Sequence, residues 1–154
     1  MVTPPALALR QAGQNWLLSC ADDPAPVRAA WNAAELAPIT SGLHWRVAEA
    51  PLVHAMEAIK RIGPRHLGPV LADVMLCRAW WLLPPGLDDE LDDVRMLTVQ
   101  PRGWPLRCAP VSYAVRSRVW VERPDGTGRL TDPTMLGASL SPGGGSRCSA
   151  RTLG

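Results

Sequence analysis

The spacing of apolar residues changes along the chain, and this change constrains the fold more than any other feature of the sequence. Near the start, apolar side chains recur every three or four positions, at Leu9, Ala12, Trp16 and Cys20. This spacing puts them on one face of a helix. From Gly68 onward, short apolar runs are separated by Pro, Gly and Asp residues, which is typical of strands joined by turns. The sequence therefore predicts a domain with helices first and strands later.

Three helices are predicted before residue 64 and one near the end of the ordered chain. They cover residues 5–20, 24–36, 51–63 and 132–140. Asp23 can accept hydrogen bonds from the free N–H groups at the start of the second helix, and Pro24 suits the first helical position. On the third helix we expect one apolar face to point inward, formed by Leu52, Val53, Met56, Ile59 and Ile62.

Short strands are predicted between and after these helices, at residues 39–41, 43–48, 69–72, 77–83, 95–99, 106–109 and 119–122. Pro124, Asp125 and Gly126 are turn-forming residues, so we expect a hairpin between 119–122 and 129–131. The predicted class is α+β, a two-layer mixed β-sheet with three to four helices mostly on one face. It occupies residues 1–140 as a single domain, and the Gly- and Ser-rich residues 141–154 are expected to be a disordered tail.

Length and composition exclude several classes of protein. The 154 residues suit one domain. No apolar run is long enough to span a bilayer, so no membrane partner is expected. The first twenty residues lack the basic start and the cleavage site of a secretory signal, so the protein is expected in the cytoplasm.

Known catalytic motifs and metal-ligand spacings are absent from the sequence. Cys20, Cys77, Cys108 and Cys148 occur singly, without the close pairs of zinc sites. The acidic run at residues 88–93 lacks the order of a calcium loop. The motifs GxSxG, GxGxxG and the phosphate-binding loop do not occur. We therefore predict no metal, no cofactor and no catalytic residue.

A catalytic site assembled only in space remains a minor alternative. It would be built around Cys108, Ser112 or one of the histidines, which are His44, His54 and His66. None of these histidines lies beside a nucleophile in the sequence.

Charge is divided unevenly along the chain. Residues 1–93 hold seven basic and eleven acidic side chains, whereas residues 94–154 hold nine basic and three acidic ones. The basic half could contact an anionic partner, although a merely solvated basic surface has the same composition. A nucleic-acid interface is therefore one of two interpretations of this charge.

The dipeptide Trp80-Trp81 is the most unusual local feature. In a strand, successive side chains point to opposite faces, so the two indoles should lie on different sides of the sheet. They could form a base-stacking platform beside Arg78, or they could pack in the core and under a helix.

Four segments together resemble a known family in their order and spacing. They are Asp22–Trp31, Gly42–Ala50, Trp80–Gly86 and Arg102–Ser112. The first resembles the "TDP, two residues, I/V-R-x-W" helix that opens the amino-terminal domain of bacterial bifunctional primase-polymerases. The other three are similar to its metal-binding strand, its aromatic strand and its strand ending in Pro-Pro-Ser. Small uncharacterised actinobacterial proteins share the same outline, and the resemblance covers about residues 15–136.

The resemblance implies a polymerase site that this sequence does not complete. The family holds two metal ions with paired carboxylates, a histidine near the aromatic strand and a further carboxylate. Here Arg46 or Ala48 stands where acids are expected, which leaves Glu49 alone on that strand. Arg78 or Ala79 replaces the histidine, and Val99-Gln100-Pro101 offers no third carboxylate.

These departures predict a catalytically degenerate primase-polymerase-like domain. We expect it to bind single-stranded nucleic acid or a nucleotide, through Arg46, Arg78, Trp80, Trp81, Arg102 and Arg107. The alternative function is that of a protein–protein interaction domain with no nucleic-acid role.

Overall fold

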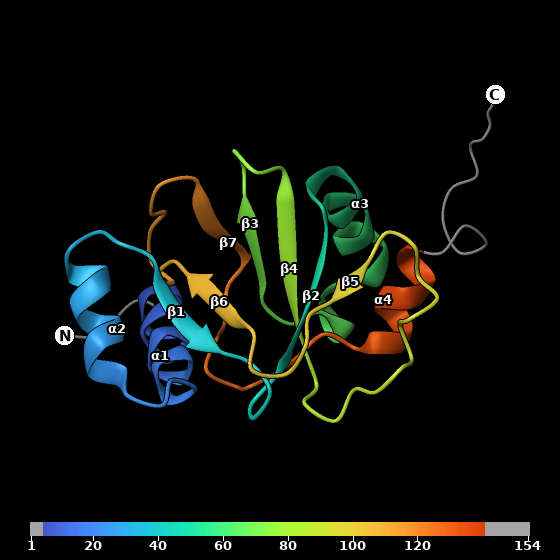
Figure 1. The fold of residues 1–154 in the computed structure, drawn as a ribbon. Coiled ribbons are helices and arrows are strands. Elements are labelled where there is room, and N and C mark those ends of the chain that lie inside the picture. The colour runs from blue at the N-terminus through green and yellow to red at the C-terminus, as the bar shows by residue number, and fades with distance from the viewer. Residues whose placement is uncertain (1–4, 141–154) are drawn as a thin grey trace.

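The computed structural model describes residues 5–140, which form four α-helices and seven strands (Figure 1). The helices are α1 (Pro5–Ser19), α2 (Pro24–Asn32), α3 (Leu52–Ile62) and α4 (Pro133–Leu140), with a 3-10 turn at Pro64–His66. The strands are β1 (Ala37–Thr40), β2 (Arg46–Pro51), β3 (Val70–Asp73), β4 (Arg78–Leu83), β5 (Thr98–Val99), β6 (Pro105–Cys108) and β7 (Arg118–Glu122). The expected α+β class is confirmed.

The strands form a five-stranded sheet in the order β5-β2-β4-β3-β7 and a two-stranded ribbon of β1 and β6. Every strand pair is antiparallel. In the register of the large sheet, Glu49 lies opposite Trp80, and Asp73 lies opposite Arg78. This register brings side chains from four strands together on one face.

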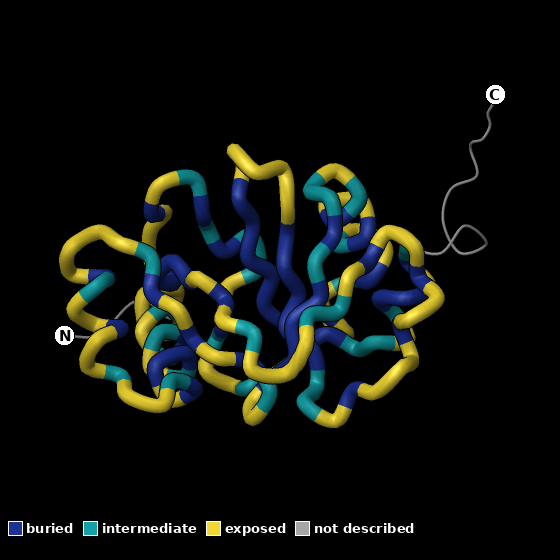
Figure 2. Tube along the Cα trace, viewed as in Figure 1, coloured by how far each residue is buried: buried dark blue, intermediate teal, exposed yellow. Residues whose placement is uncertain are grey.

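The helices divide between the two faces of the sheet instead of gathering on one (Figures 1 and 2). One hydrophobic cluster joins α1, α2 and the β1–β6 ribbon to Leu71, Trp80 and Trp120. The other joins α3 and α4 to Ala48, Trp81 and other residues on the opposite face. The central strands are apolar on both faces, so both faces must be covered, which a two-layer arrangement would not achieve.

Helix α3 is rotated relative to the predicted orientation. Its buried residues are Ala55, Ala58 and Ile62, while Val53 is 67% exposed and Met56 is also exposed. Leu52 and Ile59 are partly buried and pack against the edge of the second hydrophobic cluster. The prediction that Val53 and Met56 face inward is wrong, because the two small alanines let the helix backbone approach the sheet closely and so define its inner face.

The predicted hairpin after β7 does not form. Strand β7 pairs with β3, and residues 123–132 cross to the far side of the sheet, where the Thr131 N–H donates to the Leu82 carbonyl. The turn at Gly126 packs tightly on α1, since a Cβ there would lie 2.7 Å from that of Ala12. Contact with α1 and with the sheet therefore replaced strand pairing. We call residues 123–132 the strap.

Other element boundaries differ by a few residues. Helix α2 ends at Asn32 because Ala34 adopts a positive φ of 57°, and β5 has two residues where five were predicted. No helix within residues 5–140 is long and apolar enough to cross a bilayer. The predicted tail, residues 141–154, lies outside the described residues.

Candidate functional site

Two rows of side chains cross the face of the large sheet that is partly covered by β6. The sheet register places Glu49, Trp80, Leu71 and Trp120 in one row. The adjacent row holds Arg78, Asp73 and Arg118. Alternation along each strand explains this, because residues two apart share a face. The charged side chains of the two rows form two arginine–carboxylate pairs.

The first pair, Asp73 and Arg118, is buried, and both side chains make further hydrogen bonds. Arg118 Nε lies 2.9 Å from Asp73 Oδ2, and the Ser117 hydroxyl donates to Oδ1 at 2.6 Å. Arg118 also donates to the Arg107 carbonyl at 2.7 Å and stacks over the Trp80 ring, 4.3 Å from its centroid. Burial by itself would raise the pKa of Asp73, but the hydrogen bonds from Ser117 and Arg118 outweigh it and lower that pKa. This pair holds β3, β7 and β6 together.

The second pair, Glu49 and Arg78, is open to solvent. Glu49 Oε1 accepts hydrogen bonds from Trp80 Nε1 at 2.9 Å and from Gln100 Nε2 at 3.3 Å. Glu49 Oε2 lies 3.7 Å from Arg78 Nε, and the two side chains are 23% and 47% exposed. The carboxylate is thus fixed by two neutral donors, while the guanidinium is only loosely held. We call Glu49, Arg78 and Gln100 the Glu49 site.

The Glu49 site is built from three separate segments of the chain. Strand β2 supplies Glu49, the start of β4 supplies Arg78, and the residue after β5 supplies Gln100. These segments are separated by at least twenty residues in the chain. The contacts among them bring a carboxylate, a guanidinium and an amide together at one place on the sheet.

Arg46 and Arg102 are engaged by backbone carbonyl groups near the same edge of the sheet. Arg46 is buried and donates to the carbonyls of Leu87 at 2.8 Å and Gln100 at 3.0 Å. Arg102 is exposed and donates to Gly42 at 3.2 Å. Arg46 therefore anchors the loops around β2 and has no free surface for a phosphate, contrary to the prediction. Arg102 keeps its exposed side.

Trp80 and Trp81 lie on opposite faces of the sheet, as alternation predicted, and both are buried. Trp80 is covered by the Arg118 guanidinium, and Trp81 packs in the cluster beneath α3 and α4. Neither indole offers a free ring face to a base, so the predicted stacking platform does not exist on this surface. Packing in the core and under a helix is the arrangement found.

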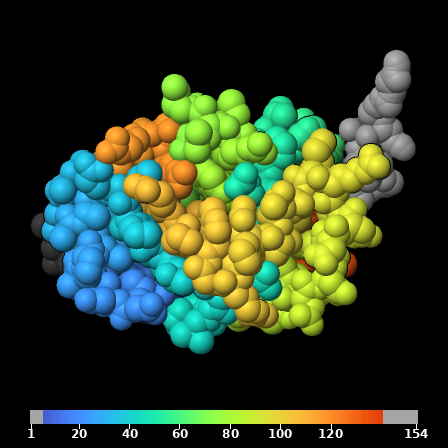
Figure 3. Space-filling model, viewed as in Figure 1, coloured from blue at the N-terminus to red at the C-terminus, as the bar shows by residue number. Residues whose placement is uncertain are grey.

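Arg107 is exposed on β6 and belongs to a long basic segment. Residues 94–121 contain five arginines and no acidic residue. The yellow and gold part of this segment runs across the viewed face, below the green β3–β4 hairpin (Figure 3). Arg95 and Arg107 are exposed on it. Neither side chain has a hydrogen bond or an ion pair within residues 5–140, so both can meet an anionic partner.

Two further residues of this face, Asp73 and Arg118, were not indicated by the sequence. The predicted strand 119–122 begins one residue after Arg118, and the predicted strand 69–72 ends one residue before Asp73, so both residues fell outside the predicted strands. Opposite charges at the ends of two neighbouring strands were the available signal, but using it requires knowledge that β3 pairs with β7.

The arrangement of the described residues does not support the minor alternative, a catalytic centre assembled only in space. Cys108 is fully buried, and this burial strongly raises the pKa of its thiol, which disfavours the reactive thiolate. The His66 Nδ1 atom lies 3.9 Å from Asp132 Oδ2, beyond hydrogen-bonding distance. Within residues 5–140, no three His, Cys, Asp or Glu side chains are grouped to hold a metal ion.

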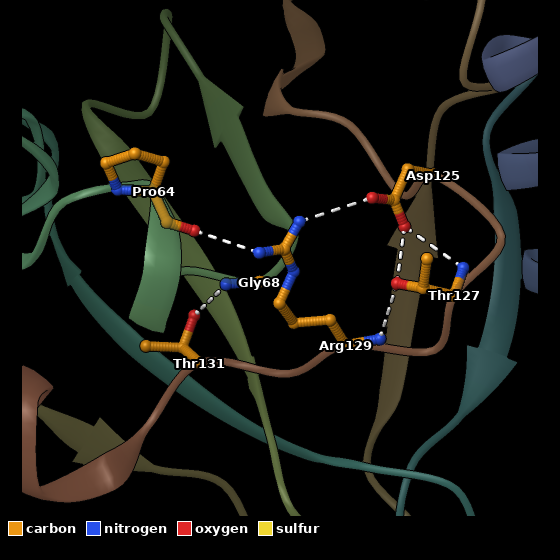
Figure 4. Close-up of polar contacts among 6 residues, drawn as sticks. All are labelled: Pro64, Gly68, Asp125, Thr127, Arg129 and Thr131. Atoms are coloured by element: carbon orange, nitrogen blue, oxygen red, sulfur yellow. Dashed lines mark hydrogen bonds and ion pairs between the residues drawn. The ribbon is translucent and has the colours of Figure 1, made fainter.

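A cavity of about 120 Å³ lies beneath the strap, beside Trp16, Pro64 and Arg129. Figure 4 shows the Arg129 guanidinium stretched between the Pro64 carbonyl, at 3.0 Å, and the Asp125 carboxylate, at 3.4 Å. Asp125 in turn accepts from the hydroxyl and the N–H of Thr127. These groups satisfy one another and fasten the strap to the turn after α3. The cavity is also smaller than the roughly 300 Å³ or more of typical ligand pockets.

The Glu49 site suits the binding of an anion better than metal-dependent catalysis. One carboxylate cannot hold the metal pair that in-line phosphoryl transfer requires, whereas a half-exposed guanidinium can bind a phosphate through two parallel hydrogen bonds.

No protein-family model matches the chain, and comparisons with curated proteins and with solved structures find no significant match.

Proposed function

We propose that the protein is a catalytically degenerate primase-polymerase-like domain that binds phosphates of single-stranded nucleic acid or of a nucleotide. The observation that carries this proposal is the contact among Glu49, Arg78 and Gln100. Three segments that resemble the family's catalytic segments meet at one point, and the groups that meet there favour phosphate binding over metal binding. Such a role is compatible with a protein of the cytoplasm.

Arg78 would replace the metal ions as the positive charge opposite a phosphate. Its guanidinium is permanently charged and can present two N–H groups to two phosphate oxygens. The Glu49 carboxylate, held by Trp80 and Gln100, orients Arg78 from one side without enclosing it. A metal-free site of this kind can bind a phosphate but cannot activate the attacking hydroxyl group.

The arginines of residues 94–121 would extend this contact along the strand. Arg95, Arg102 and Arg107 are all exposed, and no acidic residue interrupts that segment. Contacts of this type neutralise the phosphates of a nucleic acid and carry no information about its base sequence. We therefore expect binding with little sequence preference.

The test is a salt titration of binding to a fluorescein-labelled single-stranded oligonucleotide, followed by anisotropy. The logarithm of the affinity should fall linearly with the logarithm of the salt concentration, because each neutralised phosphate releases counterions. Arg78→Ala and Arg107→Ala should each weaken binding and reduce the slope by ~1. Arg28→Ala is the matched control, since Arg28 is exposed on α2, which lies well apart from β2 and β5 (Figure 1).

Two results would contradict the proposal. One is a wild-type affinity no tighter than ~10⁻⁴ M for single- or double-stranded nucleic acid at physiological salt. The other is primer extension with Mg²⁺ or Mn²⁺ and nucleotides that disappears in Glu49→Ala, because this would require a working metal site.

A further inference from the structure

The turn between β3 and β4 exposes consecutive apolar side chains. Residues 74–77, which we call the hairpin tip, are Val74, Met75, Leu76 and Cys77, and Met75 is 80% exposed. In Figure 1 the tip is the highest point of the sheet. Turns normally carry polar residues, and a run of exposed apolar residues is unfavourable in water unless it serves a contact.

The hairpin tip is held in one conformation. The buried Asp73 carboxylate accepts the Leu76 N–H at 3.0 Å, and the Val74 N–H donates to the Ser117 carbonyl at 3.0 Å. Cys77 adopts a positive φ of 56°, which is unfavourable for a residue with a side chain. Its carbonyl accepts the N–H of Leu52 at the start of α3. The backbone therefore keeps the apolar side chains pointing outward, at the cost of some strain.

The charges around the hairpin tip leave a basic group at its base. Asp73 is neutralised by Arg118. On the adjoining loop, Arg116 pairs with Glu35 at 2.6 Å. Arg78, which directly follows the tip, is only loosely paired with Glu49. The apolar hairpin tip beside the Arg78 guanidinium is complementary to nucleic acid, which has apolar base faces beside an anionic backbone.

The hairpin tip and Arg78 are close enough to contact one strand together. Met75 and Arg78 are three residues apart, which limits their Cα atoms to about 10 Å in an extended chain. This is roughly the length of three stacked nucleotides at 3.4 Å each. A phosphate at Arg78 would thus lie within a few nucleotides of a base that meets the tip.

We infer that the hairpin tip is a wedge that packs against the terminal base pair where single-stranded nucleic acid joins a duplex. Methionine and leucine side chains serve as such wedges in proteins that unstack bases. A duplex end is the favoured place, because its last base pair has one face unstacked, which makes the contact less costly than insertion within a duplex. This inference rests on the proposed function, since it assigns Arg78 to the phosphate of the same strand.

The test uses the full chain and two probes, a single strand and a duplex with a single-stranded overhang. A 2-aminopurine at the last base pair of the duplex reports unstacking by increased fluorescence. Wild-type protein should bind the overhang duplex more tightly than the single strand and increase this fluorescence. Met75→Ser with Leu76→Ser should lower affinity for the overhang duplex about tenfold, remove the fluorescence change and leave single-strand binding nearly unchanged.

The control is Leu7→Ser, which changes a similarly exposed leucine on α1. Thermal unfolding of all variants verifies that they fold, since every changed side chain is exposed.

Three outcomes would overturn the inference. If the tip variant keeps wild-type affinity for the overhang duplex while Arg78→Ala loses it, the wedge is wrong and the proposed function stands. If wild-type protein binds neither probe, both fail. If sedimentation shows a wild-type dimer that the tip variant converts to monomer, with no fluorescence change on the duplex, the hairpin tip is a protein interface.

Discussion

Two arginine–carboxylate pairs lie on one face of the same sheet, and their surroundings differ. Asp73 and Arg118 are 6% and 10% exposed and are joined at 2.9 Å, whereas Glu49 and Arg78 are 23% and 47% exposed and lie 3.7 Å apart. The ribbon of β1 and β6 covers the first pair, and Arg118 donates directly to the Arg107 carbonyl of β6. The second pair lies beyond that cover.

The comparison shows that burial decides what an ion pair does. A covered pair must satisfy every donor and acceptor internally, and once it does so it fixes the strands around it. An open pair contributes little to stability because water competes for both charges. Its arginine remains available to a ligand, so chemically similar pairs can have a structural role in one place and a binding role in another.

Removing one charge from each pair should lower stability by very different amounts. Asp73→Asn keeps the shape of the side chain but leaves Arg118 buried without a counter-charge, so the free energy of unfolding should fall by about 3–5 kcal/mol. Glu49→Gln, the matched change in the open pair, should cost less than about 1 kcal/mol. Urea denaturation measures both. Equal losses in the two variants would show that the pairs do not differ as proposed.

The stability that the buried pair contributes should depend on pH. Because the folded protein lowers the pKa of Asp73, this carboxylate stabilises the fold above its unfolded pKa of about 3.9. That contribution is lost as the pH falls from there through the lower folded-state pKa. The stability difference between wild type and Asp73→Asn should therefore shrink from pH 6 toward pH 3, as measured by denaturation at each pH.

The pKa of Asp125 is also lowered in the folded protein. Its effect on stability is the same in wild type and in Asp73→Asn, so it cancels in the stability difference between them. A stability difference that stays constant over the whole range would mean that the Asp73 charge is not coupled to folding.

Removing the Glu49 charge should also change nucleic-acid binding at the open pair, by a small factor. Glu49→Gln removes a negative charge beside the phosphate and releases Arg78, so affinity for a single-stranded oligonucleotide should rise about threefold to fivefold, equivalent to ~1 kcal/mol. The gain should decrease with added salt. Anisotropy measures it, with Glu57→Gln on α3 as the matched control for loss of an exposed acid. A weaker affinity in Glu49→Gln would instead indicate that the orientation which the carboxylate gives to Arg78 matters more for binding than its negative charge.

Local signals predicted the main elements correctly. Pro24 and Asp23 start α2, and the Asp23 carboxylate accepts the Ala25 N–H as a helix cap. Alternation also separated Trp80 and Trp81 onto opposite faces of β4. These predictions succeed because each depends on residues that are close in the chain, where capping and side-chain direction are decided.

Predictions failed where distant segments compete for the same residue. The turn chemistry at Asp125 and Gly126 formed as expected, yet no hairpin followed, because the Thr131 N–H bonds to Leu82 across the sheet. Met56 follows the apolar pattern of α3, but the smaller Ala55 and Ala58 fit closer to the sheet. In both cases packing against a distant element outweighed the local preference.

The α+β class and the charge division could be predicted from the amino-acid sequence, which also predicted Arg78 and Arg107 as binding residues. The sequence did not indicate that Arg46 and Trp80 are buried, that Arg78 is exposed, or that Gln100 contacts Glu49. Strand alternation fixes which face a side chain occupies, whereas strand order and register fix its neighbours. Register and cover depend on packing among segments far apart in the chain.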